Sequence, residues 1–278
     1  KKNWQKILNK NGVKTLGVEE SNLTVAQYKK YKKISAKIKF TNISGEIESQ
    51  REIKTAHEIA LITKSQKINE KVFLEIKKII KNWYGKSELE LAWKIKELGH
   101  EYGADDVSFD PIVGFGKNSS IVHHNPGNTT LKKGDIVLID MGMKYQGYCS
   151  DMTRMIFTAK PTTKQKEIYN LVLKAQENAI KKIKAGISGK EADKLAREII
   201  DKAGYAEQYG HAGGHGIGLD IHETPSLSEN YNKPLKENSI ITVEPGIYLE
   251  GEFGVRIEDM VLITKNGAKK LTNLSKKL

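Results

Sequence analysis

The sequence predicts an α+β fold in which helices cover a curved, mainly antiparallel sheet. Two observations predict this class. From Glu48 onwards the chain runs through two helical segments and a pair of strands, and the same order then recurs. Acidic residues recur with it, because Asp140 and Glu244 lie 104 residues apart and Asp151 and Glu258 lie 107 residues apart. We therefore expect an internal repeat with pseudo-two-fold symmetry that brings four carboxylates into one cleft.

Residues 1–47 alternate between helix and strand patterns. NWQKILNKNG is helical and ends in a glycine, VKTLGVEE is strand-like, TVAQYKKYKKIS is an amphipathic helix, and AKIKFTNIS alternates apolar with polar residues. About 50 residues are too few for an independent core. Because the chain also begins at Lys1 without a methionine, we expect this piece to be the remnant of an amino-terminal domain whose first part is missing here.

Helical spacing begins at Glu48. Apolar residues recur mostly three or four positions apart as far as Trp83, which predicts one long helix. A second helix opens with a capping box, Ser87 followed by Glu90, and ends at Gly103. These two helices form the first half of the repeat.

Strands follow the two helices. Residues 108–114 and 121–124 are strand-like, and a strand pair spans residues 136–157 with a turn near residues 145–147. The second repeat begins with a helix over about residues 163–184.

A further capping box, Ser188 with Glu191, opens the next helix, which ends at Gly204. The second strand pair spans residues 240–264. Each strand pair carries two of the four acidic residues.

The turn positions predict which carboxylates face each other. With a turn near residues 145 and 146, Asp140 lies opposite Asp151 on one face of the sheet, and a register shift of two would make them diagonal neighbours. A loop centred on Gly251 likewise places Glu244 across from Glu258. Ionised carboxylates in apolar strands are costly unless their charge is compensated. Carboxylates this close share a proton or bind cations, and convergence of four favours cations.

An imidazole completes the predicted ligand set. His215 or His222 supplies it, since both lie with His211 in the glycine-rich segment HAGGHGIGLDIHE, where the backbone can approach closely. Four acidic groups and one imidazole suit Mn²⁺, Co²⁺ or Zn²⁺ better than copper or an iron–sulfur cluster.

Composition excludes several other classes. The formal net charge is +12, but lysines are spread over every predicted helix, which favours a solvated surface over nucleic-acid binding. No apolar run is long enough to span a bilayer, and the amino terminus lacks the pattern of a signal peptide. The single cysteine, Cys149, cannot form an internal disulfide, and we expect it to be buried. We expect a cytoplasmic protein that binds neither membranes nor nucleic acid.

From about residue 48 to the end, the ordered motifs closely resemble those of the pita-bread metallopeptidases, and within them the branch of Xaa-Pro aminopeptidases and Xaa-Pro dipeptidases. No single motif is specific, whereas the set is. The motifs are D-x-G at Asp140–Gly142, S-D-M-T-R at Ser150–Arg154, G-H-G-I-G at Gly214–Gly218, V-E-P-G-I-Y at Val243–Tyr248 and G-V-R-I-E-D at Gly254–Asp259. The resemblance implies that residues 1–47 belong to a creatinase-like amino-terminal domain and residues 48–278 to a pita-bread catalytic domain.

The resemblance also implies two divalent metal ions, with Mn²⁺ favoured and Co²⁺ or Zn²⁺ as alternatives. Asp140 would chelate one ion, Asp151 and Glu258 would bridge both, and His215 and Glu244 would complete the other. The family's reaction uses a water activated between the metals, whose proton Glu244 would handle.

Three histidines match family positions near the substrate, and one arginine lies close to a proposed ligand. His123 matches the branch's histidine beside the substrate, although the neighbouring His124 leaves an ambiguity of one residue. His222 matches the histidine that stabilises the tetrahedral intermediate, and His211 one that lines the proline pocket. Arg256 lies two residues before Glu258, so on a strand it shares that face and can orient carboxylates or substrate.

Several alternatives share the fold. Methionine aminopeptidase is similar around GHGIG and HETP, but the remaining motifs favour the proline-specific branch. Creatinase lacks the metals, and a catalytically silent module that binds protein or RNA would have lost ligands, whereas all five are retained here.

Within the branch, the sequence favours an aminopeptidase that cleaves the Xaa-Pro bond of longer peptides over a dipeptidase restricted to Xaa-Pro. The two activities differ in whether a group of the protein binds the proline carboxylate and so closes off the far end of the substrate. Such a group can lie in the amino-terminal domain or in a partner subunit, because the full-length protein is expected to be a homodimer.

Overall fold

The computed structural model describes residues 2–34 and 37–277. The chain divides into two compact units, Lys1–Arg51 and Glu52–Leu278. In the first unit the order is helix, strand, helix, strand, as predicted, followed by one short helix. Its elements are α1 (Lys2–Lys10), β1 (Thr15–Val18), α2 (Val25–Ile34), β2 (Lys39–Asn42) and α3 (Glu46–Arg51), and β1 pairs with β2 in parallel.

The long helix predicted from Glu48 is wrong at its start. Helix α3 ends at Arg51, and α4 (Ala56–Ile79) begins anew after Thr55. The Thr55 hydroxyl accepts a hydrogen bond from the backbone N–H of Glu58, whose carboxylate accepts one from the N–H of Thr55. This capping box gives hydrogen-bond partners to two N–H groups at the start of a helix. A helix continuous from Glu48 would have no unpaired N–H groups at this point.

The second unit begins with the first half of the repeat. Its helices are α4, η1 (Ile80–Asn82), α5 (Glu88–Glu101) and η2 (Gly116–Ser120), and its strands are β3 (Asp106–Val107), β4 (Ile112–Phe115), β5 (Ile136–Met141), β6 (Met143–Tyr145), β7 (Tyr148–Cys149) and β8 (Met152–Phe157). The predicted capping box of Ser87 and Glu90 is confirmed. The strand predicted at residues 121–124 is wrong, because side chains rather than a neighbouring strand bind this segment.

The second half follows the same order. Helices α6 (Thr163–Lys182) and α7 (Gly189–Lys202) precede η3 (Ala206–Gln208), and the strands are β9 (Gly214–Gly216), β10 (Glu223–Leu227), β11 (Ile240–Val243), β12 (Gly246–Leu249), β13 (Phe253–Arg256), β14 (Asp259–Thr264) and β15 (Gly267–Lys270). The capping box of Ser188 and Glu191 is confirmed.

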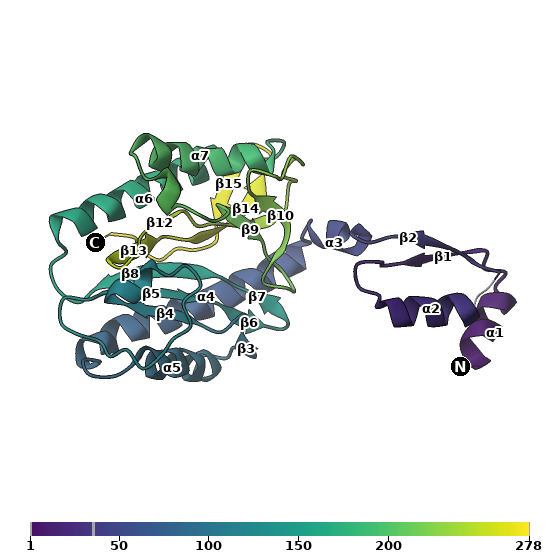
Figure 1. The fold of residues 1–278 in the computed structure, drawn as a ribbon, viewed down its shortest axis with the longest axis horizontal. Helices are drawn as coiled ribbons and strands as arrows, with labels where there is room; N and C mark the ends of the chain where they lie inside the picture. The colour runs from purple at the N-terminus through teal and green to yellow at the C-terminus, as the bar shows by residue number, and fades with distance from the viewer. Residues whose placement is uncertain (1, 35–36, 278) are drawn as a thin grey trace. The chain divides into compact units, whose positions relative to one another are not determined.

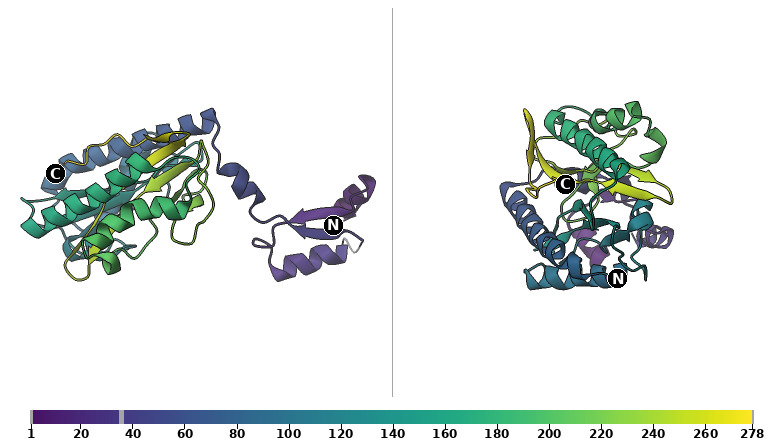
Figure 2. Two further views of the ribbon diagram at one scale, coloured as in Figure 1. Left: turned by 90° about the horizontal axis from the view of Figure 1, so that it is seen from above. Right: turned by 90° about the vertical axis from the view of Figure 1, so that its left-hand side faces the viewer.

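In the second unit the strands lie between two pairs of helices. Helices α4 and α5 cover one side, and α6 and α7 cover the other (Figures 1 and 2). The paired strands are antiparallel and form the orders β4-β5-β8, β3-β6-β7, β12-β13 and β10-β9-β11-β14-β15. Apolar side chains of α4 and α5 pack on β5 in one core cluster, and those of α6 and α7 pack on β11 in another.

The two strand pairs differ in how well their register was predicted. In the first, Asp140 pairs with Thr153 rather than Asp151, so the predicted pairing is wrong by two residues. The turn is formed by Gln146 and Gly147, both with positive φ (48° and 82°), as in the two-residue turns that suit hairpins. The second register is confirmed, because Gly246 pairs with Arg256 around a loop centred on Gly251.

None of the helices that the structure describes is long and apolar enough to cross a membrane.

A glycine between β5 and β6, Gly142, permits the two arms of the first strand pair to approach each other closely. A Cβ atom on Gly142 would overlap the carbonyl oxygen of Ser150 and crowd Ser108. We expect Gly142→Ala to lower the free energy of unfolding by about 1–3 kcal/mol, the usual cost of overpacking. Urea unfolding measures this loss. Gly267→Ala is the matched control, because a Cβ there meets no atom within 4 Å; equal effects at both sites would contradict the account.

Candidate metal centre

The four acidic residues lie where strands end or break. Asp140 is the fifth residue of β5, Asp151 lies between β7 and β8, Glu244 directly follows β11, and Glu258 lies between β13 and β14. The interruptions occur at corresponding places in the two halves, so the carboxylates converge from both. Asp140, Asp151 and Glu258 are buried, with 8%, 4% and 1% of their surface exposed.

One histidine joins the acids. His215 on β9 has its Nε2 3.5 Å from Oδ2 of Asp151 and 3.5 Å from Oε1 of Glu244. Ligand atoms of Asp151, His215 and Glu258 all lie within 4.8 Å of one another, a grouping that could hold a metal ion. The Nδ1 of His215 lies 3.0 Å from the carbonyl oxygen of Gly216 and donates to it in the neutral ring, which leaves the Nε2 lone pair facing the acids.

Arg256 on β13 compensates part of the charge. Its Nη2 donates to Oδ2 of Asp140 at 2.6 Å, and its Nε donates to Oγ1 of Thr153 at 3.0 Å. The Thr153 hydroxyl in turn donates to Oε2 of Glu258 at 2.7 Å. Arg256 and Thr153 therefore connect Asp140, from the first half, with Glu258, from the second.

Three of the acids have a raised pKa. Burial, followed by the charges of Asp140 and Glu244, raises the pKa of Asp151 well above its ordinary value. Burial and the charge of Asp151 do the same to the pKa of Glu258. Burial also raises the pKa of Glu244, although the nearby His215 and Arg256 oppose the shift. Without a cation, this group of carboxylates therefore binds protons more strongly than separate acids do.

The donor set fits divalent cations. Within the described part of the chain, Asp140 Oδ1 and Asp151 Oδ1 are buried without a hydrogen-bond partner. Buried anionic oxygens without donors are costly, and a cation with carboxylate and imidazole ligands would satisfy them. The residues brought together are the five that the sequence singled out: Asp140, Asp151, His215, Glu244 and Glu258.

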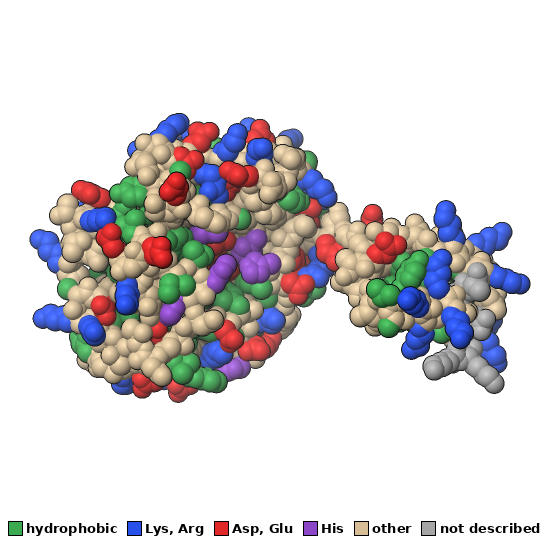
Figure 3. Space-filling model, viewed as in Figure 1, with side chains coloured by type: hydrophobic (Ala, Val, Ile, Leu, Met, Phe, Trp, Pro, Cys, Tyr) green, Lys and Arg blue, Asp and Glu red, His purple; other side chains and the backbone are tan. Residues whose placement is uncertain are grey.

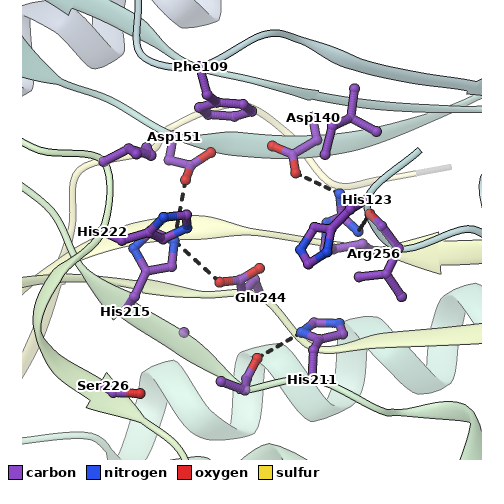
Figure 4. A pocket seen from close by; sticks show the side chains of 15 residues that line it. Phe109, His123, Asp140, Asp151, His211, His215, His222, Ser226, Glu244 and Arg256 are labelled. Carbon is purple, nitrogen blue, oxygen red and sulfur yellow. Dashed lines mark hydrogen bonds and ion pairs between the residues drawn. The ribbon is translucent and has the colours of Figure 1, made fainter. Parts of the chain in front are cut away.

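A cavity of about 350 Å³ opens onto these residues. Asp140, Asp151, His215 and Glu244 line it, whereas Glu258 lies behind them. Figure 4 shows Asp151, His215 and Glu244 on one side, with Asp140, Arg256 and His123 on the other. Apolar walls come from Phe109, Ile112, Val122 and Ile221.

Four histidines line the same cavity: His123, His211, His215 and His222. Figure 3 shows several histidine side chains gathered on one face of the molecule. The ring of His222 lies edge-on to His215 with the centroids 4.4 Å apart. Burial and the neighbouring His215 and His123 lower the pKa of His222. His124, the sequence neighbour of His123, bonds Glu88 instead and does not line the cavity.

His211 belongs to a hydrogen-bond chain that ends at Arg256. Arg256 Nη1 donates to the Tyr248 hydroxyl at 2.7 Å, and His211 Nε2 lies 3.0 Å from that hydroxyl. Burial, with the positive charge of Arg256 nearby, lowers the pKa of His211 to about 4. His211 is therefore neutral near pH 7, donating from Nδ1 to the carbonyl of Ala212 and accepting from Tyr248 at Nε2.

Two of these residues, Thr153 and Tyr248, were not predicted to belong to the site. Both lie in the family motifs, but neither of them was assigned a function from the sequence. Thr153 pairs with Asp140 in the observed register, so a correct turn position would have placed it beside the acids. Tyr248 precedes the loop at Gly251 and lies on the same strand pair as Arg256. The predicted register was therefore sufficient to place Tyr248 near Arg256.

Comparisons with known proteins agree with this geometry. Residues 60–265 match the family model of metallopeptidase family M24, and residues 1–53 match that of the creatinase/prolidase N-terminal domain. The chain is 42% identical over 268 residues to the Xaa-Pro dipeptidase of Pyrococcus horikoshii, which covers 96% of this chain and 75% of that protein.

Two solved structures are similar throughout. An Xaa-Pro dipeptidase from Bacillus anthracis has a TM-score of 0.95 at 40% identity, and an X-Pro aminopeptidase from Thermotoga maritima has a TM-score of 0.92 at 38% identity. Each alignment covers 99% of this chain and 77% of the other. The predicted α+β pita-bread fold is therefore confirmed, and the family implies divalent metals.

The Thr153 hydroxyl allows a test of how the ligands are oriented. We expect Thr153→Val, which keeps the shape but removes the donor to Glu258, to weaken divalent-metal binding about 10- to 100-fold, as losses of groups supporting ligands do. Titration calorimetry with Mn²⁺ measures the affinity. Thr153→Ser restores the hydroxyl and should bind like the wild type; a Val variant with unchanged affinity would remove Thr153 from the centre.

The raised pKa of Glu258 has a definite sign in stability. Because folding raises this pKa above the ordinary 4.5, the stability contribution of Glu258 is fully present below about pH 4.5 and is lost as pH rises through the folded-state pKa. At pH 8, metal-free Glu258→Gln should therefore unfold about 2–4 °C or more above the metal-free wild type, the shift expected for about 1 kcal/mol. Near pH 4 the difference should disappear.

Calorimetric scans with and without Mn²⁺ measure how Glu258 affects the unfolding temperature of the metal-free and the metal-bound protein. Added metal should raise the unfolding temperature of the wild type and have much less effect on the Gln variant. Glu167→Gln, at an exposed position of α6, is the matched control and should show neither effect. Identical behaviour of the two glutamate variants would contradict the role of repulsion.

Proposed function

The chain belongs to metallopeptidase family M24, and from this membership we propose that it is a dinuclear-metal Xaa-Pro dipeptidase, or prolidase. The observation that carries the proposal is the convergence of four carboxylates and one imidazole beside a cavity with apolar walls, which three of the carboxylates and the imidazole line. Residues 48–278 supply all of these groups, and we propose that they form the catalytic domain.

Five residues would hold the two metal ions: Asp140, Asp151, His215, Glu244 and Glu258. Their oxygen-rich set suits Mn²⁺, with Co²⁺ or Zn²⁺ as alternatives. When bound, divalent cations lower the pKa of water and polarise a carbonyl group. The protein's own contribution is to hold its carboxylates in place, which Arg256 and Thr153 support through hydrogen bonds to Asp140 and Glu258.

Glu244 handles the proton of the attacking water. Its carboxylate oxygen lies 3.2 Å from the Thr242 hydroxyl and 3.5 Å from Nε2 of His215, so it is held at the cavity edge. Its raised pKa favours acceptance of a proton. The leaving group is the nitrogen of proline, which takes the proton as the peptide bond breaks.

Neutral histidines and apolar walls bind the substrate. His222, whose lowered pKa favours the neutral ring, stabilises the charge that develops on the carbonyl oxygen by donating an N–H. His123 lies on the opposite side and contacts the substrate. His211 and the apolar walls of the cavity enclose the proline ring, which carries no N–H once bound in a peptide.

The choice between dipeptides and longer peptides rests on the relatives. The sequence favoured the aminopeptidase, whereas the names of two relatives at 42% identity, Xaa-Pro dipeptidases from two Pyrococcus species, support the dipeptidase. The Thermotoga structure carries the name X-Pro aminopeptidase at 38% identity, which keeps that activity as the second candidate. The two functions share all five proposed ligands and differ in what closes the far end of the cavity.

Hydrolysis assays with metal-stripped protein test the proposal. We expect release of the first residue from Ala-Pro only after Mn²⁺ is restored, and a loss of at least about 10²-fold in Asp151→Ala, the order of effect of removing one strong electrostatic group. Asp201→Ala, at an exposed position of α7, is the matched control. Cleavage of Ala-Pro but not Ala-Pro-Ala supports the dipeptidase.

Cleavage of both peptides at comparable kcat/KM would favour the aminopeptidase instead. Cleavage that survives complete metal removal, or that is unaffected in Asp151→Ala, would contradict the metal-dependent mechanism.

A further inference from the structure

A buried carboxylate outside the metal centre forms hydrogen bonds with several residues of one loop. Glu88, the first residue of α5, is fully buried, with 0% of its surface exposed. Its Oε1 accepts hydrogen bonds from the backbone N–H of Phe115 at 2.8 Å and from Nδ2 of Asn118 at 2.9 Å. Its Oε2 lies 2.8 Å from Nε2 of His124 and accepts from the N–H of Gly127 at 3.2 Å. All four partners belong to residues 115–127.

The same loop is held from the cavity side. Arg256 Nη1 donates to the carbonyl oxygen of Val122 at 3.2 Å. His123 therefore lies between two anchors, one at Val122 and one at His124. Its side chain lines the cavity, whereas that of His124 meets Glu88, which does not line it.

We propose that Glu88 and His124 are positioning residues that fix His123 at the cavity. The proposal deepens the proposed function, on which the substrate contact of His123 rests. Residues 121–124 have no strand partner among the described residues. One backbone hydrogen bond, from the N–H of Ile121 to the carbonyl oxygen of Asn118, holds the start of this segment, and the side chains of Arg256 and Glu88 hold Val122 and His124. The contact of His124 with Glu88 turns the neighbouring His123 toward the metal ligands.

Burial makes this restraint stronger than a contact at the surface would be. A buried carboxyl group without hydrogen-bond partners would be costly, so the loop gains from keeping every partner in place. Removal of the His124 ring leaves Oε2 with a single backbone donor, and the loop can then rotate to satisfy it in other ways. A displacement of about 1 Å at a group that contacts substrate can cost about 10²-fold in rate.

Three single variants test the restraint while leaving Glu88 intact. We expect His124→Ala to lower kcat/KM for Ala-Pro about 10- to 100-fold, with Mn²⁺ affinity unchanged, because no metal ligand touches His124. His124→Gln can still donate an N–H to Glu88 and should recover most of the activity. His100→Ala, an exposed histidine of the same helix α5, is the matched control.

A double-mutant cycle separates positioning from general weakening. If His124 acts through His123, His124→Ala should add little to the loss already caused by His123→Ala. Losses that multiply in the double variant would overturn the proposal.

A measurement independent of activity distinguishes the proposal from the function on which it rests. Ring signals of His123, followed by NMR in protein loaded with diamagnetic Zn²⁺, should shift in His124→Ala and return in His124→Gln. Wild-type protein that cleaves no Xaa-Pro peptide would overturn the proposed function, and the His123 signals would still decide the positioning claim. Unchanged His123 signals in His124→Ala would overturn the proposal that His124 positions His123.

Discussion

Repulsion among buried carboxylates is the constraint around which the second unit is built. Folding brings Asp140, Asp151, Glu244 and Glu258 together in surroundings that disfavour charge, and burial raises the pKa of Asp151 and Glu258. Arg256 neutralises only part of this charge. Apolar packing offsets the rest, because the apolar clusters under the two helix pairs and a third, smaller cluster hold the strands that carry the acids. Stability is thus given up at the point where chemistry is proposed to take place.

Interruptions between strands place the acidic side chains at the site. Three of the four acids lie just outside regular pairing, where their side chains are not committed to an alternating sheet face. Thr153 and Arg256 remain inside strands and supply fixed donors. The arrangement therefore combines rigid donors with acceptors at strand ends, and it explains why the same pattern serves in both halves of the repeat.

The sequence predicted elements better than the contacts between them. Capping boxes are local, so the starts of α5 and α7 were predicted correctly, and the loop at Gly251 fixed the second register. The first register was wrong because the turn at Gln146 and Gly147 lies one residue later than the one assumed, which moves every pairing partner by two residues.

The five proposed ligands were found from their motifs, since ionisable residues in apolar strands stand out. Glu88 and Thr153 were not, because a capping-position glutamate and a strand threonine look ordinary until distant segments meet them. The same limit applies to the segment at residues 121–124, whose apolar letters suggested a strand although its partners are side chains far away in the sequence.

The division of the ligands between two halves has a consequence for how the unit unfolds. A cation held by Asp151 and Glu258 would act as a reversible cross-link that closes a loop of 107 residues. Such a closure removes chain entropy from the unfolded state, and it joins two halves that already share one apolar cluster, which contains Ile62 and Cys149 from the first and Ile240 and Met260 from the second. Cofactor supply would then govern cooperativity as well as chemistry: with the link in place the halves are joined by the metal as well as by their shared apolar cluster, and without it by that cluster and the strand contacts.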